Sequence, residues 1–100
     1  MIDHSKEGDR DLVKINENIV ASNANALKDA LAKIVQDGAE QLTIDMTDVR
    51  SIDSMGLGVL IAAHNSLQKK GNRLQIIHAN DDIRKLFQAM RIDQHFEIVA

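Results

Sequence analysis

The chain has 100 residues, enough for one small domain, and its 44% hydrophobic and 27% charged residues exclude an intrinsically disordered protein. Acidic residues outnumber basic ones by 15 to 12, for a net charge of -3, and Trp and Tyr are absent, which argues against a basic nucleic-acid-binding module. The chain has no cysteine, which excludes disulfides, thiolate metal sites, iron–sulfur clusters and cysteine nucleophiles.

The first half of the chain predicts a strand, a helix and a second strand. Residues 1–10 are polar and lack periodicity, so we expect a loose arm or weak edge strand before a domain over residues 11–100. Apolar residues at 12, 13 and 15 predict a short strand, which residues 19–20 continue. From residue 24 the apolar positions predict a helix capped by Ser22 or Asn23. Alternation over residues 42–46 predicts the next strand.

The second half continues the alternation of helices and strands. The apolar positions of residues 55–70 predict a helix, and residues 74–77 predict a strand. Asn80 is expected to cap a short helix that carries Asp81 and Asp82 in its first turn. Residues 95–99 predict a last strand. This order predicts one α/β domain, in which helices pack on a mostly parallel, mixed sheet of four to five strands.

Few residues carry a recognisable chemistry. The four histidines lack ligand spacing, and Gly56 and Gly58 form too short a motif for a dinucleotide or phosphate loop. Asp45, Asp48 and Asp53 lie near strand ends, as in a receiver-like domain that takes phosphate on aspartate with Mg²⁺, but turns and caps explain them equally well. We therefore expect neither a metal nor a cofactor, and no enzymatic activity.

The start of the second helix is unusual because two glycines fall in its first turns. Each glycine costs about 1 kcal/mol in a helix interior, so something is expected to approach the backbone of Gly56 and Gly58 closely, either a packed strand or a partner. The simplest role of Ser54 is to cap the free N–H groups of this helix with its hydroxyl.

This segment resembles the STAS domains of anti-sigma factor antagonists (anti-anti-sigma factors). The likeness covers residues 11–99 and is carried by three stretches. These are residues 42–49, residues 70–74 with 83–87 and 91–93, and above all the run Asp53, Ser54, Met55, Gly56, Leu57, Gly58.

The resemblance implies that Ser54 is phosphorylated by a partner kinase of the histidine-kinase-like ATPase type that doubles as an anti-sigma factor, and that a serine phosphatase reverses it. It also implies partner binding through residues 53–58, with Gly56 and Gly58 keeping the helix entrance open. Met55 stands where many members have a second Ser or Thr. Residues 17–20 depart from the Gly-Glu-Leu/Ile-Asp pattern of the loop that lies near the phosphoacceptor.

Two interpretations follow. In the first, an apolar shoulder of Met55, Leu57 and Val59 binds the partner until a phosphate on Ser54 repels it. In the second, the chain is a constitutive structural subunit of a transport or signalling assembly, contacted through the small side chains of Ala62, Ala63 and Ser66. We expect a monomer or a weak dimer, since a weak edge strand at the N-terminus could pair with another chain. The absence of a long apolar stretch predicts no membrane insertion and a cytoplasmic protein.

Overall fold

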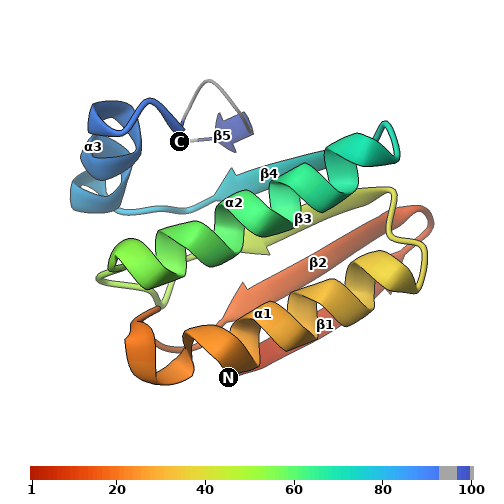
Figure 1. The fold of residues 1–100 in the computed structure, drawn as a ribbon, viewed down its shortest axis with the longest axis horizontal. Helices are drawn as coiled ribbons and strands as arrows, with labels where there is room; N and C mark the ends of the chain where they lie inside the picture. The colour runs from red at the N-terminus through yellow and green to blue at the C-terminus, as the bar shows by residue number, and fades with distance from the viewer. Residues whose placement is uncertain (93–96, 100) are drawn as a thin grey trace.

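A computed structural model describes residues 1–92 and 97–99 of the chain. The strands of this described part form one sheet in the order β1-β2-β3-β4-β5 (Figure 1). Their bounds are Ile2–Glu7, Arg10–Ile15, Gln41–Asp45, Arg73–Ile77 and Glu97–Val99. β1 runs antiparallel to β2, and every other neighbouring pair is parallel. The predicted mostly parallel, mixed sheet is confirmed.

Three helices connect the parallel strands of the described residues: α1 (Ala21–Gln36), α2 (Ser54–Lys69) and α3 (Asp81–Ala89). Figure 1 shows α1 and α2 side by side against one face of the sheet, while α3 lies beyond β4. Both α1 and α2 begin at the end of the sheet where β2, β3 and β4 finish. None of the described helices combines the length and the apolar character that crossing a bilayer requires.

The core lies between the sheet and the helices α1 and α2. In β2 and β4 alternate residues are buried, whereas in β3 the three consecutive residues 42–44 are buried. The apolar side chains of these strands form one core with the apolar faces of both helices. The fully buried side chains from these elements include Val13, Ile15, Leu27, Leu31, Leu42, Ile44, Leu60, Leu67, Leu74 and Ile76. Burying each such side chain contributes about 1.5–3 kcal/mol, so this layer holds both helices against the sheet.

The predicted start of α1 is wrong. The helix begins at Ala21 with Val20 as its N-cap residue, so Ser22 and Asn23 lie inside the first turn. Asn23 still assists, because its Oδ1 accepts from the Val20 N–H at 2.9 Å. The acceptor that satisfies the Ala21 N–H is the carboxylate of Asp53, far along the chain, and no local pattern could reveal it.

The ends of the other helices and strands agree with the predictions where they depend on nearby residues. The predicted cap of α3 is confirmed, since Asn80 Oδ1 accepts from the Ile83 N–H at 2.8 Å. Ile19 does not continue β2, but forms an isolated parallel bridge with Ile52. Residues 2–7 form the edge strand β1, and the division of the chain at residue 10 stays a prediction. Of the last predicted strand, residues 95–96 lie outside the described part, and β5 begins at Glu97.

Candidate functional site

The loops that follow β2, β3 and β4 are joined by asparagine side chains. Asn18 Oδ1 accepts from the N–H groups of Arg50 and Ser51, at 2.8 and 3.1 Å. Asn80 Nδ2 donates to the Arg50 carbonyl at 3.1 Å. The carboxyl ends of parallel strands are the usual place for binding sites in α/β folds. Here the loops form one connected edge, and α1 and α2 start from it (Figure 1).

Asp53 caps two helices at once. Its Oδ1 accepts from the Gly56 N–H of α2 at 3.0 Å, and its Oδ2 accepts from the Ala21 N–H of α1 at 2.9 Å. Its own N–H donates to the Ile19 carbonyl at 3.0 Å. The backbone of Asp53 is extended, which aims the side chain at the third amide of α2. The half-buried carboxylate therefore ties the beginnings of both helices together.

Ser54 is not the cap of α2, so that interpretation of its hydroxyl is wrong. The serine is the first residue of the helix, and the preceding aspartate already satisfies the Gly56 N–H. Its side chain is exposed and makes no hydrogen bond with the residues that the structure describes. The exposed Ser54 hydroxyl at the start of α2 therefore has no structural role.

Gly56 is required by packing within the chain itself. A Cβ atom built on Gly56 would lie 2.5 Å from Ile19 Cγ2, 2.8 Å from the Ile19 carbonyl oxygen and 2.8 Å from Ile52 Cγ1. The close approach expected from the sequence is therefore made by the protein's own loop. The loop that departs from the family pattern, residues 17–20, accordingly lies against the start of α2. Gly58 differs, because a Cβ there would meet no atom within 4 Å.

The predicted apolar shoulder is largely buried. Met55 is 54% exposed, but Leu57 and Val59 are only 5% and 7% exposed and belong to the core. The prediction that Leu57 and Val59 contact a partner at the surface is therefore wrong. The exposed surface at the start of α2 is small and consists of the Ser54 hydroxyl, the Met55 side chain and the Gly58 backbone.

The three aspartates of the receiver-like alternative have separate partners. Asp45 pairs with His78 at 3.1 Å, Asp48 lies 3.5 Å from Lys14 Nζ, and Asp53 caps the helices. Among the described residues, no group of three or more acidic or histidine side chains is arranged to hold a metal ion.

Asp45 should make the stability of the folded chain depend on pH in the acidic range. Burial raises the pKa of its carboxyl, but hydrogen bonds from the Thr47 hydroxyl and N–H, and then from His78, outweigh burial and lower the pKa below 3.8. A lowered folded-state pKa contributes stability that is present above the unfolded pKa and lost as the pH falls through the folded one. We expect Asp45→Asn to destabilise the protein at pH 7, by a difference that shrinks as the pH falls below about 4. Urea unfolding measured across this range tests this, and a difference that stays constant with pH would contradict it.

The asparagine contacts at this edge were not predicted from the sequence. Asn18 stands in the polar break between residues 15 and 19, within the segment that departs from the family pattern, and this was the available signal. The other histidines are placed apart: His4 lies 2.6 Å from Asp11, His64 is buried on α2, and His95 lies outside the described residues.

Comparison with known proteins gives a consistent picture. The family model described as "Mlab, STAS domain" matches residues 2–100. The anti-sigma-B factor antagonist of Listeria monocytogenes is 33% identical over 95 residues, which cover 93% of this chain and 83% of the relative.

Two solved structures have the same fold. An anti-sigma factor antagonist from Mycobacterium paratuberculosis has a TM-score of 0.88 at 22% identity, covering 98% of this chain and 83% of the other. The Bacillus cell fate determinant SpoIIAA in its phosphorylated form has a TM-score of 0.78 at 12% identity, covering 100% and 92%.

Proposed function

The chain belongs to the STAS domain family, and from this premise we propose that it is a non-catalytic regulatory module of the anti-sigma factor antagonist type, controlled by reversible phosphorylation of Ser54. The observation that carries the proposal is the exposed Ser54 hydroxyl, which has no structural task at the start of α2. A relative at 33% identity is named an anti-sigma-B factor antagonist, and a structure of the same fold is a phosphorylated form.

A phosphate on Ser54 would act on the surface and leave the helix folded. It adds about -1.5 to -2 charges at neutral pH, and the start of a helix tolerates an anion because its N–H groups and dipole favour negative charge. The Asp53 carboxylate keeps its two hydrogen bonds and remains close by as a like charge. A partner that covers Met55 would have to desolvate this doubly charged group, so the complex is destabilised.

The partners follow from this mechanism. The chain supplies a hydroxyl and a docking surface, while nucleotide, metal and base come from a kinase. We propose a serine kinase and anti-sigma factor of the histidine-kinase-like ATPase type, a serine phosphatase and a cytoplasmic location. Residues 53–58 form the proposed contact, with Ser54, Met55 and Gly58 touching the partner and Asp53, Gly56 and Leu57 holding them in place.

A pull-down from cells of the source organism tests the proposal. The full chain and its Ser54→Ala and Ser54→Asp variants serve as bait, and Ser5→Asp places the same charge on the exposed β1 strand as a control. We expect an ATPase to be retained by the unmodified, Ser54→Ala and Ser5→Asp baits and lost with Ser54→Asp. The purified ATPase should transfer phosphate from Mg-ATP to Ser54. Retention of an ATPase that never modifies Ser54, equally by all four baits, would favour a constitutive structural subunit instead.

A further inference from the structure

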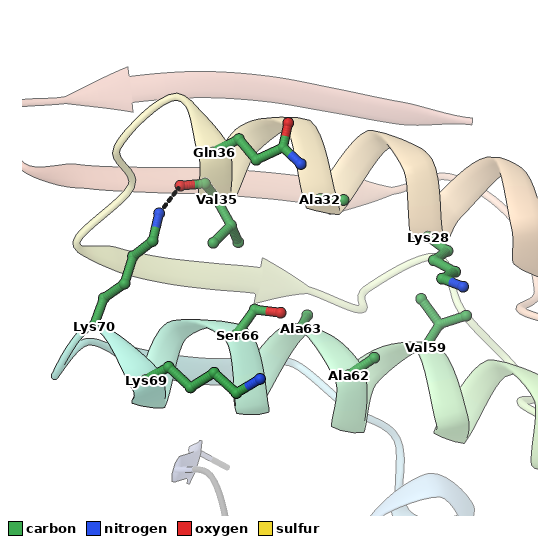
Figure 2. A pocket seen from close by; sticks show the side chains of 10 residues that line it. All are labelled: Lys28, Ala32, Val35, Gln36, Val59, Ala62, Ala63, Ser66, Lys69 and Lys70. Atoms are coloured by element: carbon green, nitrogen blue, oxygen red, sulfur yellow. Dashed lines mark hydrogen bonds between the residues drawn. The ribbon is translucent and has the colours of Figure 1, made fainter.

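A groove runs between α1 and α2 along their outer side (Figure 2). Its volume is about 330 Å³, and its apolar base is formed by the buried side chains of Val35, Val59 and Ala63. Ala62 and Ser66 stand along it and are exposed to solvent. Small side chains on both helices keep this apolar groove open.

The groove is bordered by positive charge. Figure 2 shows Lys28 at one end and Lys69 and Lys70 at the other. The ten lining residues include no Asp or Glu, although the chain as a whole has a net charge of -3. Lys70 Nζ donates to the Val35 carbonyl at 3.1 Å. Lys28 and Lys69 are exposed and form no ion pair with a described residue.

We propose that this groove binds an acidic amphipathic helix of a partner protein. Helix axes pack 8–10 Å apart only where the side chains at the contact permit it, and the small Ala62 and Ser66 side chains do so. An apolar stripe on the partner helix would cover the base of the groove. Carboxylates beside that stripe would reach Lys28 and Lys69.

The length of the groove sets the spacing on the partner. At 1.5 Å per residue, the lining residues span about 12 Å along α1 and about 16 Å along α2. A partner helix of two to three turns fills this length. Its acidic residues should therefore lie toward both ends of the apolar stripe, opposite the lysines at the two ends of the groove.

The openness of the groove favours a helix over a fatty acid. Small-molecule sites bury about 70–90% of the ligand surface. Here Ala32, Ala62 and Ser66 are exposed, so an acyl chain in the groove would remain in contact with water. A partner helix would instead place its own polar face outward.

The groove is a second surface, separate from the start of α2. Val59, its nearest α2 residue, is five positions after Ser54, or about 7.5 Å along the helix axis. Binding there does not require Ser54 to be modified. Failure of the Ser54 proposal would therefore leave this one standing, and the reverse also holds.

Peptide binding to the full chain tests the proposal. The first probe is an acetylated, amidated peptide of about four helical turns with leucines at i, i+4 and i+7 and flanking glutamates; the second carries lysines in place of the glutamates. The double variant Lys28→Glu/Lys69→Glu reverses the charge of the groove. Lys6→Glu/Lys85→Glu makes the same change at exposed sites elsewhere. Dissociation constants come from fluorescence anisotropy, and amide chemical shifts locate the site.

We expect the unmodified chain and the Lys6→Glu/Lys85→Glu control to bind the acidic peptide at least about tenfold more tightly than the basic one, with the shifts confined to the groove. Lys28→Glu/Lys69→Glu should reverse this preference, and Ser66→Trp should abolish binding by filling the groove. The proposal is overturned if the acidic peptide shows no saturable binding, if charge reversal leaves the preference unchanged, or if dodecanoate saturates the groove and the peptide does not.

Discussion

Replacing Gly56 with alanine should lower the free energy of unfolding by about 2–3 kcal/mol, although alanine is the better helix former. The new methyl group would overlap the side chain and the carbonyl oxygen of Ile19 as well as Ile52. The Ile19 backbone cannot easily retreat, because its carbonyl accepts from the Asp53 N–H and its N–H donates to the Ser51 carbonyl. The substitution therefore forces the loop after β2 away from α2.

Gly58→Ala is the matched control for this substitution. The same methyl group at Gly58 meets no atom within 4 Å, so only the gain in helix propensity remains, and stability should rise by up to about 1 kcal/mol. Urea unfolding of both variants measures the two changes under the same conditions. Equal effects of the two substitutions would contradict the packing role assigned to Gly56.

Asp53→Ala should lower the free energy of unfolding by about 2 kcal/mol, at the upper end of the effect of removing an N-cap. The loss is large because one carboxylate serves Gly56 at the start of α2 and Ala21 at the start of α1. Asp53→Ser keeps a short cap for α2 but cannot reach both helices, so it should lose about half as much.

Hydrogen exchange of individual amides shows whether Asp53 has both roles. In Asp53→Ala the amides of Ala21 and Gly56 should both exchange faster, whereas in Asp53→Ser only the Ala21 amide should do so. Protection of Ala21 that survives Asp53→Ala would show that the link between the two helices contributes nothing to stability.

The parts of the fold that local patterns determine were predicted well. The apolar residues at alternating or nearby positions identified β3 and β4, apolar periodicity identified α2, and Asn80 caps α3 as its position suggested. Each of these features depends on residues within a few positions of one another. Their side chains could therefore be assigned to a face or a cap from spacing alone.

The features that sequence reasoning missed depend on contacts between distant segments. Asp53 reaches Ala21 across 32 positions, and this contact moves the start of α1 away from the predicted caps Ser22 and Asn23. The requirement for glycine at position 56 comes from Ile19 in another loop. The spacing of residues along the chain does not reveal such contacts.

At the candidate site, the sequence identified the segment but not the role of each residue. The run of residues 53–58 does lie at the edge where strands end and helices begin. Which of its residues reach solvent depends on how α2 is rotated against the sheet. That rotation buries Leu57 and leaves Met55 exposed.

In the proposed mechanism, charge on Ser54 releases a partner while α2 stays folded. The most direct measurement is the dissociation constant of the retained ATPase for the chain with phosphoserine at position 54, compared with the unmodified chain. Amide chemical shifts of the same samples report on α2. We predict that phosphorylation weakens the affinity for the ATPase at least about a hundredfold, because burying the phosphate beside the like charge of Asp53 costs several kcal/mol. The helical shifts of α2 should be retained. Unchanged affinity in the phosphorylated chain, or loss of the α2 shifts on phosphorylation, would contradict the account.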